Sequence, residues 1–149
     1  MNLVVGATGT LGSEICRLLV AARQPVRALI RATADADKAA RLERMGVTLV
    51  RGDLKDRASL DKACRGVNTV VSTASSTISR QAGDSIETVD RNGQMSLFAA
   101  AKAAGVRHAV LISFPPVDIE FPLQSAKRAV ERCLMDSGMP RPRPRSLRA

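Results

Sequence analysis

Apolar positions follow two different periods along the chain, and the alternation between them predicts the fold. Short apolar runs predict strands at 3–5, 26–30, 47–50, 67–73 and 108–113. Apolar positions three or four residues apart and helix-favouring composition predict helices at 11–19, 35–45, 56–64, 86–104 and 123–135. Strands that alternate with helices predict an α/β fold, in which helices cover both faces of a doubly wound, parallel, five-stranded sheet.

The end of the chain has a different composition from the rest. Residues 140–149 alternate proline with arginine and contain no acidic residue, so they can form neither a helix nor a central strand. We therefore predict one domain over 1–139 and a disordered tail over 140–149. Much of the net charge of +9 lies in this tail. The rest of the chain is only mildly basic, which suits an anionic cofactor and does not require nucleic acid.

Composition excludes several other classes of protein. The 149 residues are 45% apolar and 25% charged, as in a globular domain, and no apolar run reaches the ~18 residues of a membrane helix. The first residues lack the pattern of a secretory signal, so we expect a cytoplasmic protein. Three widely spaced cysteines, Cys16, Cys64 and Cys133, predict neither disulfides nor a metal site. His108, the only histidine, is expected to be structural.

A glycine-rich loop joins the first predicted strand to the first predicted helix. Its spacing is Gly-x-x-Gly-x-x-Gly, and the loop reads Gly6, Ala7, Thr8, Gly9, Thr10, Leu11, Gly12. The first glycine allows a tight turn, the second lets a pyrophosphate approach the backbone, and the third lets the helix pack closely. Free N–H groups at the helix start then face the phosphate. The loop predicts a dinucleotide site, and the alternative is a glycine-rich turn without a ligand.

The residue after the second strand indicates which dinucleotide is bound. An acidic residue there would bind the ribose 2′-hydroxyl of NAD(H). This chain has Arg31 instead, and the planar guanidinium suits a 2′-phosphate. Lys38, early in the next helix, could assist. We therefore predict NADP(H), with a solvated loop charge as the alternative role for Arg31.

Longer segments support a family resemblance. They are Val-Val-Gly-Ala-Thr-Gly-Thr-Leu-Gly at 4–12, Val-Arg-Ala-Leu-Ile-Arg at 26–31, Gly-Asp-Leu at 52–54, Val-Asn-Thr-Val-Val-Ser-Thr-Ala at 67–74, Ala-Ala-Lys-Ala-Ala-Gly-Val-Arg-His at 100–108 and Ala-Lys-Arg-Ala-Val-Glu at 126–131. Over 1–139 the chain resembles the NmrA-like NAD(P)-binding proteins, a group of atypical short-chain dehydrogenases/reductases. The resemblance implies a Rossmann fold with Asp53 and Leu54 beside the adenine and Ala74 along the nicotinamide half. Lys127 matches the lysine of the Tyr-x-x-x-Lys pair, which holds the nicotinamide ribose.

Two features depart from the family. The tyrosine position holds Leu123, the chain has no tyrosine at all, and Ser113 is only an approximate match for the family's serine. The family also continues past the position of Pro140 into another strand and a substrate region, which suggests that this chain is truncated. The strand at 108–113 would then be an open sheet edge, through which the chain could self-associate.

These observations predict a sheet with strand order 3-2-1-4-5 that binds NADP(H) as part of an oxidoreductase acting on a small organic substrate. Lys127 and Ser113 are the candidate catalytic residues. One alternative is a regulator that senses NADP(H) without turnover. The other is a nucleic-acid contact made by the basic tail, whose binding would depend steeply on salt.

Overall fold

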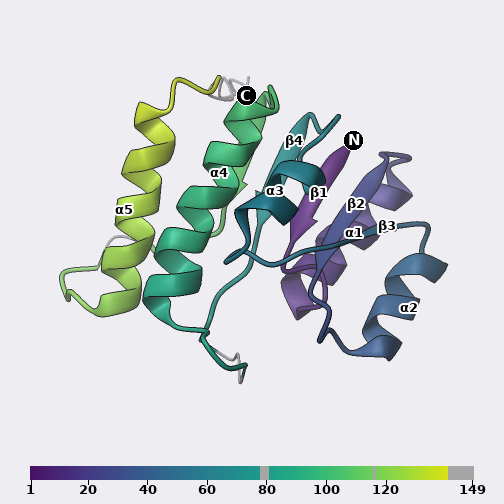
Figure 1. Ribbon diagram of the computed structural model, residues 1–149, viewed down its shortest axis with the longest axis horizontal. Helices are drawn as coiled ribbons and strands as arrows, with labels where there is room; N and C mark the ends of the chain where they lie inside the picture. The colour runs from purple at the N-terminus through teal and green to yellow at the C-terminus, as the bar shows by residue number, and fades with distance from the viewer. Residues whose placement is uncertain (78–80, 116, 141–149) are drawn as a thin grey trace, which may run out of the picture.

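A single parallel sheet forms the centre of the molecule (Figure 1). The computed structural model describes residues 1–77, 81–115 and 117–140, so most of the predicted tail lies outside it. The strands lie in the order β3-β2-β1-β4-β5, and all neighbouring pairs are parallel. They are β1 Asn2–Val5, β2 Val26–Ile30, β3 Thr48–Arg51, β4 Thr69–Ser72 and β5 His108–Leu111. The predicted fold class and strand order are confirmed.

The helices divide between the two faces of the sheet (Figure 1). One face is covered by α1 (Thr10–Ala21) and α2 (Ala36–Arg44), and the other by α3 (Arg57–Ala63), α4 (Gln94–Ala103) and α5 (Pro122–Asp136). Neighbouring strand residues point to opposite faces, so Val4 packs toward α1 and α2 while Leu3 and Val5 pack toward α3 and α4. No helix in the described residues is long and apolar enough to cross a membrane.

The long helix predicted at 86–104 is present, but its first half has π-helical geometry. Residues Ile86–Gly93 form a π-helix, η1, which leads directly into α4. The backbone of Gly93 lies against Leu54, and a Cβ at this glycine would be 2.9 Å from the Leu54 Cβ. Asp90 and Gln94 are both buried here, which gives the start of this long helix a polar inner face that periodicity did not indicate.

Candidate functional site

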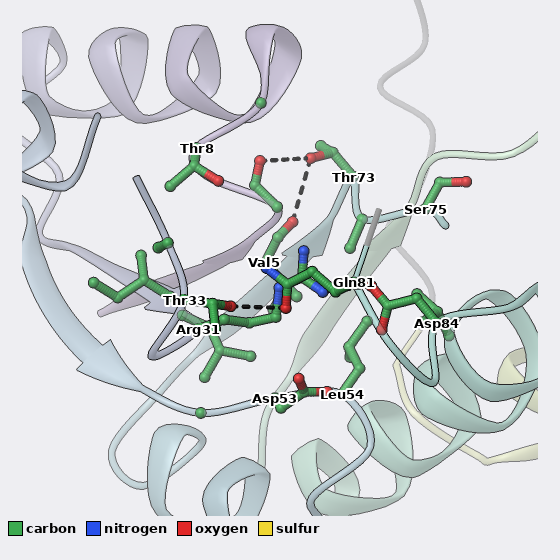
Figure 2. A pocket seen from close by; sticks show the side chains of 18 of the residues that line it. Val5, Thr8, Arg31, Thr33, Asp53, Leu54, Thr73, Ser75, Gln81 and Asp84 are labelled. Carbon is green, nitrogen blue, oxygen red and sulfur yellow. Dashed lines mark hydrogen bonds and ion pairs between the residues drawn. The ribbon is translucent and has the colours of Figure 1, made fainter. Parts of the chain in front are cut away.

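A cavity of about 460 Å³ opens where the strands end at their carboxyl side (Figure 2). Its walls come from the loop after β1 and from the residues that follow β2, β3 and β4. Strand order reverses between β1 and β4, and ligands of open α/β sheets bind at this point of reversal. The topology therefore places the cavity where this class of sheet holds its ligand.

Two of the loop glycines are required by the fold itself. Gly6 has a φ of +86°, and a Cβ there would lie 2.5 Å from Thr73 Oγ1. Gly12 packs its backbone against the loop, because a Cβ there would lie 2.2 Å from the Gly6 carbonyl oxygen. Thr73 joins the ends of β1 and β4, since its hydroxyl lies 3.3 Å from the carbonyl oxygens of Val5 and Gly6 (Figure 2).

Gly9 differs from its two neighbours in the motif. Its φ of −79° suits any residue, and a Cβ there would meet only the Gly6 carbonyl oxygen, at 3.3 Å. Gly9 lines the cavity and precedes α1, which has no side-chain N-cap bond and no acidic residue in its first turn. The positive end of the α1 dipole and its first N–H groups are therefore open to an anion.

Cations and carboxylates meet at the end of the cavity beside β2 and β3. Arg31 Nη1 lies 2.5 Å from Asp84 Oδ2, and the Asp84 side chain is only 1% exposed. The other Asp84 oxygen accepts a hydrogen bond from the Lys55 ammonium. Arg31, the predicted phosphate ligand, is thus already bound to a carboxylate that lies 53 residues further along the chain.

Lys127 does not line this cavity and lies inside the interface between η1 and α5. Its Nζ is 3.6 Å from Asp90 Oδ1, and the two side chains are 7% and 0% exposed. Asp90 Oδ2 accepts hydrogen bonds from the backbone N–H and the hydroxyl of Ser76, in the segment that follows β4. Burial lowers the pKa of Lys127 from its ordinary value, and the Asp90 carboxylate opposes this effect.

Ser113 is not a lining residue of the cavity either. It follows β5, and its hydroxyl donates to the Glu131 carboxylate on α5. Arg128 donates to both oxygens of the same carboxylate. Burial raises the pKa of Glu131, but the hydrogen bonds from Arg128 and Ser113 outweigh it, so the net pKa lies below the ordinary value. Ser113 is therefore held in a contact between β5 and α5.

The structure brings together most of the predicted cofactor residues. Those that line the cavity are Gly6, Thr8, Gly9, Arg31, Lys38, Asp53, Leu54 and Ala74. Thr10, Leu11 and Gly12 form the first turn of α1 directly behind the loop. Local sequence patterns did not indicate Thr73, Gln81 or the cavity role of Asp84, because their partners are 48 to 68 residues away along the chain.

Comparison with known proteins decides the family. The model of the NmrA-like family matches residues 2–142. The chain belongs to the NmrA-like family. Among its family relatives, an NAD(P)H azoreductase of Xenophilus azovorans is 40% identical over 111 residues, which are 74% of this chain and 34% of that protein. A photosystem II assembly factor, Ycf39, of Trieres chinensis is 32% identical over 140 residues, which are 93% of this chain and 42% of that protein.

A solved relative is similar in three dimensions as well. An NADPH-dependent quinone oxidoreductase of Escherichia coli, in complex with NADPH, has a TM-score of 0.71 and 26% sequence identity. The match covers 93% of this NmrA-like chain and 46% of the oxidoreductase. The chain thus spans less than half the length of each of the three relatives.

Proposed function

We propose that this NmrA-like chain binds NADP(H) in the cavity and serves as the cofactor-binding part of a reductase that acts on a small organic substrate. The observation that carries the proposal is Gly9, because the fold alone gives no strong reason for glycine there. A ligand that must approach the backbone at the start of α1 supplies that reason. The relatives that are reductases support the choice of chemistry.

The residues around the cavity fit the parts of a dinucleotide. The N–H groups after Gly9 would bind the pyrophosphate, and Asp53 and Leu54 would lie beside the adenosine. Arg31 and Lys38 are the cations for a 2′-phosphate, and Ala74 lies on the wall toward β4. When bound, NADP(H) supplies hydride transfer at its nicotinamide ring, and the chain positions it and shields it from water.

A variant at Gly9 tests this proposal. We expect Gly9→Val to abolish NADPH binding in calorimetry while far-ultraviolet circular dichroism shows a folded chain, since the backbone at Gly9 suits a side chain. The control is Ala21→Val, which introduces a valine at the exposed far end of the same helix, away from the loop. This variant should bind NADPH with the affinity of the parent chain. Unchanged binding by Gly9→Val would contradict the proposal.

A second candidate function is cofactor binding without turnover. Three features of the candidate catalytic residues favour it. Lys127 forms an ion pair with Asp90, and the Ser113 hydroxyl donates a hydrogen bond to Glu131. The position of the family's tyrosine holds Leu123. General acid catalysis contributes about 10²–10⁴-fold to a rate, and the usual donor is absent. NADPH oxidation in the presence of an azo dye or a quinone would favour the reductase, and binding without oxidation would favour the second candidate.

A further inference from the structure

Asp84 lies where three segments of the chain meet at the adenosine end of the cavity. It precedes η1. Its carboxylate forms ion pairs with Arg31, which follows β2, and with Lys55, in the loop after β3. The carboxylate is 1% exposed, whereas the Arg31 and Lys55 side chains are 36% and 29% exposed. Asp84 is therefore a buried anion that holds two partly exposed cations.

The other carboxylates at this end of the cavity have different partners. Asp35 caps α2 and accepts from the backbone N–H of Lys38 at 3.0 Å. Asp53 accepts from the backbone N–H of Lys55 at 2.8 Å, and its other oxygen is 3.9 Å from the Lys55 ammonium. Of the carboxylates that line the cavity, Asp84 makes the short contacts with cationic side chains in the described structure.

A carboxylate and a phosphate compete for the same face of a guanidinium. Both present oxygens that accept paired N–H bonds from arginine, and Arg31 already gives Nη1 to Asp84. A 2′-phosphate on Arg31 must share this donor or displace Asp84. It also meets the negative charge of Asp84, and the repulsion is larger in a partly buried site than in water.

We propose that Asp84 is a specificity-determining residue that weakens the binding of the 2′-phosphate and so narrows the preference of the cavity for NADP(H) over NAD(H). This inference rests on the proposed function, because it assumes that the cavity binds a dinucleotide. Asp84 acts as an internal substitute for the phosphate. A cofactor without that phosphate leaves the contacts of Asp84 with Arg31 and Lys55 in place.

The segment that carries Asp84 has further attachments that do not depend on its charge. Gln81 accepts a hydrogen bond from the Thr33 hydroxyl at 2.7 Å (Figure 2). The Gly83 carbonyl accepts one from the Thr88 hydroxyl at 2.7 Å. Asp84→Asn has nearly the same shape as the parent residue, so the segment should keep its place when the charge is removed.

Calorimetric titration of the 149-residue chain with NADP⁺ and NAD⁺ tests the inference. We expect Asp84→Asn to bind NADP⁺ about 10-fold more tightly than the parent, as one additional charge-assisted contact would give, and to bind NAD⁺ with unchanged affinity. Asp61→Asn is the matched control, because it removes the same charge from an exposed ion pair on α3 and should change neither affinity.

Each outcome has a defined meaning. Weaker or unchanged NADP⁺ binding by Asp84→Asn would overturn the inference, since Asp84 would then orient Arg31 or have no influence on it. Failure of the parent to bind either cofactor would overturn the proposed function, and the inference with it. If Asp84→Asn does not fold, Asp84→Ser removes the same charge with a smaller side chain, and the same expectations apply.

Discussion

The buried ion pair between Lys127 and Asp90 gives a prediction that separates a structural role from a cofactor role. Lys127 Nζ is 3.6 Å from Asp90 Oδ1, and that oxygen has no hydrogen-bond partner among the described residues. In Lys127→Met, the Asp90 carboxylate would stay buried with its charge no longer compensated. Breaking a buried pair in this way costs about 3–5 kcal/mol, a large part of the ~5–15 kcal/mol that stabilises a domain.

Urea unfolding followed by far-ultraviolet circular dichroism measures this cost, because the chain has no tryptophan or tyrosine for fluorescence. Asp90→Asn combined with Lys127→Met removes both charges and keeps an oxygen for Ser76. The double variant should therefore lose at least about 1 kcal/mol less than the sum of the two single variants. Arg57→Met breaks the exposed pair with Asp61 and should cost less than about 1 kcal/mol.

Additive losses in the double variant, or a loss in Lys127→Met as small as in Arg57→Met, would refute a stabilising contact between Lys127 and Asp90. The pH dependence provides a second readout. Because the pKa of Lys127 is lowered in the folded state, the unfolded chain binds more protons as the pH approaches the ordinary value of 10.5. This group therefore contributes a rise in the free energy of unfolding with pH, which Lys127→Met should lack.

Two further predictions concern groups inside the fold. Burial raises the pKa of the Cys16 and Cys64 thiols to about 11 from 9.0, so these thiols ionise first in the unfolded chain. They should therefore contribute a fall in the free energy of unfolding between pH 9 and 11, opposite in sign to the contribution of Lys127. Replacing both thiols with alanine should flatten this fall in thermal melts at a series of pH values, and an unchanged slope would contradict it. Gly12→Ala should cost about 1–3 kcal/mol in urea unfolding, because its Cβ would lie 2.2 Å from the Gly6 carbonyl oxygen. Gly9→Ala should cost little, and equal costs at the two glycines would show that the loop packs differently.

Local patterns in the sequence were sufficient to predict the strands and the glycine loop. The apolar runs at β1 and β2 are buried at most positions on both faces, so a continuous apolar run was enough to predict these strands. Gly12 is required by its contact with the Gly6 carbonyl oxygen, which the motif spacing encodes. Gly6 has a positive φ in a tight turn, but the atoms that would meet a Cβ there belong to Thr73 and Ala74, far along the chain. Strand ends were less accurate, since β4 and β5 end at Ser72 and Leu111, before the predicted limits.

The polar partners in the site could not be predicted from local pattern. Arg31 follows a strand in the position of a phosphate ligand, but its carboxylate partner is 53 residues away. Asp84 and Asp90 both lie near the start of a helix, where carboxylates are common because they favour the helix dipole. Their roles differ through tertiary contacts: Asp84 lies against Arg31 and Lys55 from the ends of β2 and β3, and Asp90 lies against Lys127 of α5 in the interior.

The sequence by itself determined the order of elements, the parallel sheet and the position of the glycine-rich loop, because apolar periodicity and glycine spacing act over a few residues. Tertiary structure decided which charges meet. It paired Arg31 with Asp84, Lys127 with Asp90 of η1 and Ser113 with Glu131 of α5. Such contacts depend on how distant segments pack, so the partner of a charged side chain cannot be predicted from the residues next to it in the sequence.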